Sequence, residues 1–334
     1  MGEIYRLQAA VTAAVAPTFE QAVTAFLNAH AADPGAWSTG TAKKYRETFA
    51  ALGNRLDASV AACLAQLDGP DGSAAFATAF GAAFKASAPA TYARHLSAVR
   101  SAVTWWRGLG WVTGDPTGGL VRPKIPLDTT RALTRAQIDA LFRVEARVRE
   151  KTLWRLLYES AARADEVLNL DVPDLDLANK RGRALAKGGN LEWIHWQTGT
   201  ALLLPRLLAS RTVGPVFLAD RKPVRAVALT DLCPVTGRAR LSYRRAEEIF
   251  EQTTRALANP GASKAELAEL RGWTLHQLRH SRLTHEAENG TNTPTLLVIS
   301  RHASVRSLER YARPGVDAVA AHVAATDLAA RRRH

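Results

Sequence analysis

Apolar residues recur at helical spacing along the first third of the chain. Thr18 precedes a run that reaches toward Ala31, and Gln21 follows Thr18 by three residues. This spacing is typical of a capping box, in which the two side chains cap a helix N-terminus reciprocally. A second long helix is expected from Pro89 to Trp111. Its apolar residues lie three or four positions apart, at Leu96, Val99, Val103 and Trp106. The first third is therefore predicted to be all helix.

The remainder of the chain predicts helices around one small sheet. A capping box at Thr134 marks a helix start, and a second helix is expected over residues 153–170. Two short β-prone segments, 183–187 and 191–196, flank a Gly-Gly-Asn turn and predict an antiparallel hairpin. Helical spacing returns from Leu241 onward. We therefore expect a mainly α fold, with an all-α N-terminal domain and an α-rich second domain that holds a small antiparallel sheet.

Helix-breaking residues separate these two regions. Glycine and proline concentrate over residues 114–132, which we interpret as a linker between domains. The expected order is an N-terminal extension 1–17, a helical domain 18–113, the linker, and a second domain 133–334 with a tail at 315–334. Apolar residues recur at helical spacing in that tail, so it is predicted to form a short amphipathic helix.

Charge points to a polyanionic partner. The chain of 334 residues has a formal net charge of +13, and 47% of its residues are hydrophobic. Residues 1–130 carry 11 Lys and Arg against 9 Asp and Glu, whereas residues 131–334 carry 33 against 22. Such an excess favours nucleic acid, or less strongly an anionic membrane surface. Five cations of the first domain are candidate DNA-binding residues: Lys43, Lys44, Arg94, Arg100 and Arg107.

Several function classes are disfavoured by what the sequence lacks. No run of apolar residues is long enough for a membrane span, and the N-terminus has no basic segment leading into an apolar run. The two cysteines, Cys63 and Cys233, fit neither a disulfide framework nor a zinc site, so a cytoplasmic protein is expected. There is no P-loop, no dinucleotide fingerprint, no HExxH and no GxSxG sequence.

The second domain instead contains polar residues that suit phosphate chemistry. They are Arg163 and Glu166, Lys187, His276, Arg279 and His280, His302, and Tyr311. Arginine forks match the charged oxygens of a phosphodiester, and a tyrosine can attack the phosphorus to form a covalent intermediate. A lysine on a hairpin could donate a proton to the leaving oxygen. Such a site needs no metal and no cofactor.

Taken one at a time, these residues have ordinary interpretations. Arg163 with Glu166 would be an intrahelical ion pair, Lys187 a turn lysine and Tyr311 a half-buried helix residue. His276 and His280 have the spacing of metal ligands, but a third ligand is missing nearby in the sequence. What these separate interpretations do not explain is the joint occurrence of the whole set in one order.

At these residues the sequence resembles the tyrosine recombinases, also called phage integrases. Members of that family carry an arginine in an A-R-x-x-E-like helix, a lysine in a β-hairpin and a His-x-Leu-Arg-His box. A Gly-His follows near the end, with a tyrosine nine residues after that histidine. This sequence matches with Arg163 and Glu166, Lys187, His276 to His280, His302 and Tyr311, in the same order. Residues 90–106 and 108–116 are similar to the family's helical core-binding domain, so the resemblance covers nearly the whole chain.

The resemblance implies a function and a role for each residue. The protein would be a site-specific recombinase whose two domains close around duplex DNA at a crossover site, four subunits acting on two sites. Tyr311 would attack the scissile phosphate and form a 3′-phosphotyrosine, while Arg163 and Arg279 hold that phosphate. His276 and His302 would assist proton transfer and phosphate binding, and Lys187 would protonate the leaving oxygen. Glu166 and His280 would contact the catalytic side chains and hold them in position.

The match has two departures and leaves alternatives open. Arg301 stands where most members have glycine before the histidine, a change that can alter the turn presenting His302. The core-binding domain would begin near Thr18, so we expect no arm-binding domain of the kind that larger phage integrases carry. The alternatives are a type IB topoisomerase, which uses the same chemistry on one duplex, a DNA-binding module without catalysis, and a DNA-packaging protein.

Overall fold

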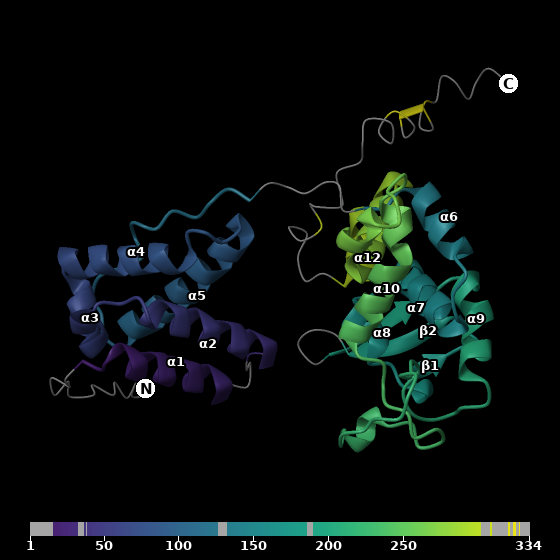
Figure 1. The fold of residues 1–334 in the computed structure, drawn as a ribbon, viewed down its shortest axis with the longest axis horizontal. Coiled ribbons are helices and arrows are strands. Elements are labelled where there is room, and N and C mark those ends of the chain that lie inside the picture. The colour runs from purple at the N-terminus through teal and green to yellow at the C-terminus, as the bar shows by residue number, and fades with distance from the viewer. Residues whose placement is uncertain are drawn as a thin grey trace, which may run out of the picture. The chain divides into compact units, whose positions relative to one another are not determined.

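The chain folds into two compact units, Met1–Pro126 and Leu127–His334 (Figure 1). The structure is a computed structural model that describes residues 16–32, 37, 39–125, 132–185 and 190–301, together with the single positions 308, 320, 323, 324 and 327. Each unit has its own apolar core and is described by itself.

The first unit is built from helices, as the sequence predicts. They are α1 (Phe19–Ala32), α2 (Thr39–Gly53), α3 (Ala58–Ala62), the 3-10 helix η1 (Leu64–Asp68), α4 (Pro70–Phe84) and α5 (Pro89–Gly108). The capping box that begins α1 is confirmed, because the Thr18 and Gln21 side chains accept from each other's backbone N–H at 3.2 and 3.0 Å. Trp106 is fully buried in the core, and its indole N–H donates to the Ala22 carbonyl at 3.1 Å.

The chain that follows α5 packs back onto this unit. Val112 and Leu120 belong to its core, and Thr117 is buried. The Arg100 guanidinium donates to the Leu120 carbonyl at 2.7 Å and so fixes the turn before that residue. The first part of the segment interpreted as a linker, 114–120, is thus folded against α5 within the first unit.

The second unit combines eight helices, as far as the structure describes the chain, with two 3-10 turns and a three-stranded sheet. The helices are α6 (Arg135–Arg143), α7 (Val148–Ser160), α8 (Ala164–Leu168), α9 (Thr198–Leu208), α10 (Tyr243–Ala258), α11 (Glu266–Glu269), α12 (Leu275–Glu288) and α13 (Thr293–Ser300), with the isolated helical positions near residue 323. The 3-10 turns are η2 (Val172–Asp174) and η3 (Leu229–Asp231), and the strands are β1 (Leu175–Asp176), β2 (Arg181–Leu185) and β3 (Leu191–His195).

The sheet has the order β1-β2-β3 and is antiparallel throughout. Arg181 pairs with His195 and Leu185 with Leu191, which confirms the two strands of the predicted hairpin. The hairpin tip, residues 186–189, lies outside the described residues. Helix α7 runs through the middle of the unit, where it packs against α9, α12 and β3 (Figure 1). Its residues Leu153, Trp154 and Leu157 are buried in the core.

The helix predicted over residues 153–170 is wrong in one respect that matters for the site. The structure breaks it after Ser160, where Ala161 adopts a left-handed conformation with φ 50°. A new helix, α8, begins at Ala164 and has Arg163 as its N-cap residue. The two alanines at the break carry no helix-breaking signal, so the interruption comes from tertiary contacts of the backbone rather than from local propensity.

Candidate active site

Arg163 and Glu166 form the first cluster, at the start of α8. The Arg163 backbone N–H donates to Glu166 Oε2 at 3.0 Å, and its Nη1 donates to Glu166 Oε1 at 2.6 Å. The glutamate thus caps the helix and holds the arginine side chain at the same time. The Arg163 side chain is 34% exposed, whereas that of Glu166 is 4% exposed. The arginine is therefore accessible to a ligand while its partner is not.

The surroundings of Glu166 keep it ionised. Burial raises the pKa of this carboxyl, but the Arg301 cation and the hydrogen bonds and charge of Arg163 outweigh it, so the pKa lies below its ordinary value. Arg301 Nη2 donates to Glu166 Oε2 at 2.8 Å. Glu166 is thus a negative charge shared between two arginines.

Arg279 lies at the centre of the second cluster, on α12. A capping box between Thr274 and Gln277 begins this helix, which places Arg279 one turn further along. Its side chain is buried, with 2% of the residue exposed, and it donates to the carbonyl oxygens of Ala161 and Ser300. One guanidinium thus joins the turn that leads into Arg163 to the end of α13, which immediately precedes Arg301 and His302.

The two histidines of the same helix differ in exposure. His276 is exposed in the first turn of α12, and His280 is buried, with 7% exposed. Their ring centroids lie 4.6 Å apart at an interplanar angle of 81°. His276 is a helix-face neighbour of both Arg279 and His280, because residues three and four apart on a helix lie next to each other.

Helix α13 ends in a turn made by an arginine. Asn292 caps its start by accepting from the Thr295 N–H at 2.9 Å, and Arg301 ends it with φ 51°. This left-handed conformation is the one that glycine adopts at least cost. The arginine at this position, noted in the sequence as a departure from the family pattern, therefore takes a backbone conformation that a glycine would also fit.

Leu308 lies in the sequence between His302 and Tyr311, the two parts of the predicted C-terminal motif. It is fully buried and packs with Ala161, Leu283 and Leu296 in a small apolar cluster. The carbonyl oxygen of Ala161 also accepts a hydrogen bond from Arg279. Leu308 therefore lies beside the turn that leads into Arg163.

Three of the predicted site residues cannot be placed in this geometry. Lys187, His302 and Tyr311 lie outside the described residues. The structure therefore brings together Arg163, Glu166 and Arg279, and their roles, like those of the other three, stay predictions.

The predicted DNA-binding residues of the first unit fall into two groups. Lys43 and Lys44 are exposed on α2, where Lys43 pairs with Glu47 at 3.8 Å, and Arg94 and Arg107 are exposed on α5. Arg100, in contrast, is half-buried and engaged with the Leu120 carbonyl. The helical pattern of α5 indicated a basic face but not this long-range hydrogen bond, which no local sequence signal announces.

Two side chains of the site were not singled out by the sequence. Glu192 lies on β3, and its Oε2 is 3.8 Å from Arg301 Nε. The carbonyl of Ser300 and the left-handed Ala161 are backbone features, for which a sequence gives no signal. Leu308 had a signal that could have been used, an apolar residue three positions before the candidate tyrosine.

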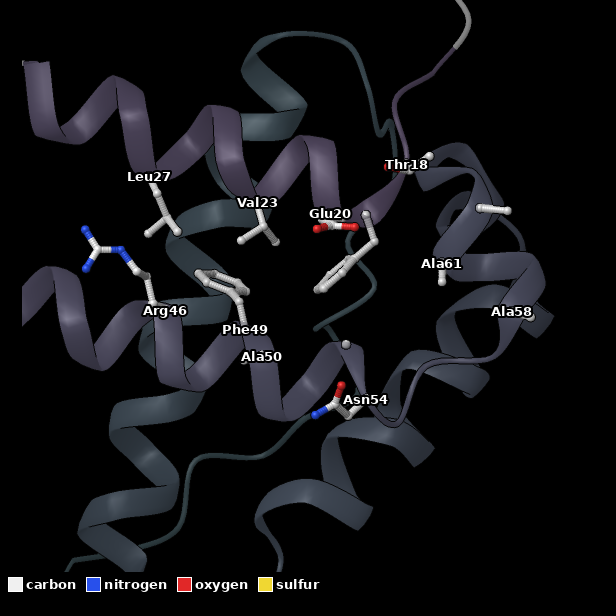
Figure 2. A pocket seen from close by; sticks show the side chains of 13 residues that line it. Thr18, Glu20, Val23, Leu27, Arg46, Phe49, Ala50, Asn54, Ala58 and Ala61 are labelled. Atoms are coloured by element: carbon white, nitrogen blue, oxygen red, sulfur yellow. The ribbon is translucent and has the colours of Figure 1, made fainter.

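One pocket among the described residues belongs to the first unit, and none of the predicted site residues lines it. It measures about 740 Å³ and lies between α1, α2 and α3. Figure 2 shows Val23 and Leu27 of α1 facing Phe49 of α2, with Arg46 beside them. Its apolar lining differs from the polar, arginine-rich cluster of the second unit.

Among the described residues, metal-binding clusters and membrane-spanning helices are both absent. No group of three or more His, Cys, Asp or Glu side chains there could hold a metal ion. Among the same residues, no helix is both long and apolar enough to cross a membrane.

Comparison with known proteins identifies the family. The model of the phage integrase family matches residues 131–316. The tyrosine recombinase XerC of Roseiflexus sp. (strain RS-1) is 26% identical over 230 residues, 67% of this chain and 68% of that protein. XerD of Caulobacter vibrioides is 28% identical over 233 residues, 67% of this chain and 70% of that protein.

Solved structures agree on the fold. The Tn1549 transposon integrase in complex with transposon right end DNA has a TM-score of 0.66 at 14% identity, and the match covers 92% of this chain and 99% of that one. Because the family model spans more than half of the sequence, the chain belongs to the phage integrase family of tyrosine recombinases.

Proposed function

We propose that the protein is a site-specific recombinase that cleaves and rejoins DNA strands through a covalent 3′-phosphotyrosine at Tyr311. The observation that carries the proposal is the position of Arg279. Its buried guanidinium holds Ala161, two residues before Arg163, and Ser300, two residues before His302. Arg279 thus connects the backbone two residues before Arg163 with the backbone two residues before His302, which lie far apart in the sequence.

In the proposed reaction Tyr311 attacks the scissile phosphate. The bond from its phenolic oxygen to phosphorus forms as the bond to the 5′ oxygen breaks, and Lys187 supplies the proton that this leaving oxygen takes. Arg163 and Arg279 stabilise the charge that develops on the non-bridging oxygens. His276 and His302 assist proton transfer and bind the phosphate. His280, on the same helix as His276, supports these groups.

The exposure of the Arg163 side chain supports the role proposed for it in phosphate binding. One third of its side chain is exposed, and Glu166 uses only Nη1 of the guanidinium. The remaining N–H groups of this fork suit a phosphate, which arginine binds with two parallel hydrogen bonds. Leu308 supports a position for Tyr311 in the region of Arg163. Leu308 packs against Ala161, and the three residues from position 308 to 311 span at most about 11 Å.

The test of this function is covalent capture of DNA. A nicked suicide substrate, from which the cleaved 5′ end diffuses away, should leave the strand attached to the protein in the presence of excess EDTA. The charge at the phosphate is neutralised by fixed arginines and a lysine, so no divalent cation is required. Loss of capture in EDTA and its return with Mg²⁺ would contradict the tyrosine mechanism.

The partner we propose is duplex DNA with a specific crossover site, bound by both units in the cytoplasm. Arg94 and Arg107 are exposed on α5, so replacing both by alanine should weaken DNA binding and reduce the slope of log affinity against log salt by about 1 to 2. The melting temperature should stay unchanged. Filter binding or fluorescence anisotropy at several salt concentrations measures this.

Arg100→Ala is the matched control on the same helix. It removes a donor to the Leu120 carbonyl, so it should lower the melting temperature and change the salt slope less than the double variant. A salt slope that falls equally in both variants would contradict this separation of roles.

We further propose that four subunits assemble on two DNA sites and that the C-terminal tail links them. Ending the chain after Pro314 should leave binding to a single site intact but reduce synaptic complexes and recombination, because a cyclic contact between neighbouring subunits is lost. Native gels or sedimentation with paired sites measure this. Undiminished tetramer and full recombination would place the tail on its own subunit.

A further inference from the structure

Arg301 combines two features that each cost free energy. Its backbone is left-handed, with φ 51°, a conformation that an L-residue adopts less favourably than the right-handed helix. Its side chain is 5% exposed, and a buried guanidinium destabilises the fold unless carboxylates neutralise it. The contacts of this side chain must therefore offset both costs.

The first contact is with the carboxylate that also holds Arg163. Glu166 Oε1 accepts a hydrogen bond from Arg163 Nη1 at 2.6 Å, and Glu166 Oε2 accepts one from Arg301 Nη2 at 2.8 Å. Oε2 also accepts from the Arg163 backbone N–H. Because both oxygens are engaged, the carboxylate cannot turn and bind the Arg163 guanidinium with two bonds. No other described residue bonds that guanidinium, so its remaining N–H groups can bind a phosphate.

The second contact leads to the hairpin. Arg301 Nε lies 3.8 Å from Glu192 Oε2 on β3, which is within range of an ion pair but too long for a hydrogen bond. Both atoms are buried and have no hydrogen-bond partner among the described residues. A movement of about 1 Å would bring them to hydrogen-bond distance. β3 is one strand of the hairpin whose tip includes Lys187.

We propose that Arg301 is a positioning residue that joins Arg163 and the lysine hairpin to the turn before His302, through Glu166 and Glu192. The proposal rests on the recombinase function proposed above. It assigns two arms to one guanidinium: the Glu166 arm sets the orientation of Arg163, and the Glu192 arm sets the position of the hairpin.

The first experiment tests the Glu166 arm by single-turnover cleavage of a suicide substrate. Arg301→Gly keeps the left-handed turn, since glycine adopts it freely, and removes only the side chain. The cleavage rate constant should fall about 10- to 100-fold, the effect expected when a catalytic group is misplaced by about 1 Å, while the Kd for DNA stays within about twofold. Arg301→Lys, which keeps the charge, should restore part of the rate.

A structural role alone would give a different result. It would lower the melting temperature and the amplitude of cleavage, which reports the folded fraction, but not the rate constant of the folded enzyme. A rate constant equal to wild type in Arg301→Gly would overturn the proposal. So would a loss that adds fully to that of Glu166→Gln, because residues acting through one carboxylate should not contribute independently.

The second experiment tests the Glu192 arm with a substrate whose leaving 5′ oxygen is replaced by sulfur. A thiolate leaves without needing a proton, so the variant's defect should disappear if it concerns the lysine. Glu192→Gln should therefore cleave the ordinary substrate more slowly than wild type and the sulfur substrate at the wild-type rate. An equal defect on both substrates would contradict the hairpin arm.

A third measurement does not depend on activity. In the DNA-free protein, Arg301→Gly should speed amide hydrogen exchange in two segments remote in sequence, 163–168 and 191–195, relative to wild type. Unchanged exchange in both segments would overturn the proposal, whatever the cleavage rates. Faster exchange in a protein whose wild type never captures DNA would support the coupling and refute the proposed function instead.

Discussion

Replacing Tyr311 by phenylalanine should abolish covalent capture of a suicide substrate. The substitution removes only the phenolic oxygen, so no bond to phosphorus can form, while the ring and the surrounding fold are kept. DNA affinity should stay within a few-fold of wild type, because binding depends mainly on phosphate contacts made by cations elsewhere on the protein. Denaturing gels with a labelled strand measure capture, and anisotropy measures affinity.

The control for this prediction is Tyr243, which is exposed at the start of α10 and is no member of the proposed set. Tyr243→Phe should capture DNA as the wild type does. Capture retained by Tyr311→Phe and lost by Tyr243→Phe would identify Tyr243, and not Tyr311, as the nucleophile.

The same substrates separate recombination from the topoisomerase alternative. A recombinase exchanges strands between two sites and should show capture only on DNA that carries its crossover sequence. A type IB topoisomerase would relax supercoiled DNA of unrelated sequence without exchange. Relaxation of any plasmid at the rate of site-specific exchange would favour the topoisomerase.

Elements with local signals could be predicted from the sequence. The capping boxes at Thr18 and Thr134 mark the starts of α1 and α6, and the hairpin strands follow from β-prone residues around a glycine turn. The mainly α fold follows from apolar residues at helical spacing, and the phage integrase family and its chemistry were implied by the resemblance of an ordered set of polar residues to the family's motifs. Each of these features is encoded within a short stretch of chain or in the order of a motif.

Features set by long-range contacts could not be predicted. The break between α7 and α8 occurs at Ala161, a good helix former, whose carbonyl receives Arg279 from 118 residues further along the chain. Arg100 was assigned to DNA by its helix face, yet its guanidinium binds a carbonyl 20 residues away. The left-handed Arg301 likewise depends on Glu166, which is remote in sequence. In each case a charged side chain makes a contact with a residue remote in sequence, and no local pattern signals that contact.

Arg163→Ala should lower the cleavage rate on the order of 10²–10³-fold, as removal of one preorganised donor to a developing charge does. The fold should survive, because Arg163 is one third exposed and Glu166 keeps Arg301 as a partner. Arg279→Ala should lose a similar factor in rate. It should also lose stability, since the carbonyls of Ala161 and Ser300 are left without their donor, at about 1–3 kcal/mol for each buried group.

Arg282→Ala provides the matched control on α12. This arginine is largely buried and pairs with Glu286 at 2.7 Å, so its loss should reduce stability without touching the proposed phosphate contacts. Single-turnover rates normalised to the folded fraction separate the two effects. Arg279→Ala should then remain slow and Arg282→Ala should match wild type. A normalised loss under about tenfold for both Arg163→Ala and Arg279→Ala would mean that these arginines hold the fold and not the phosphate.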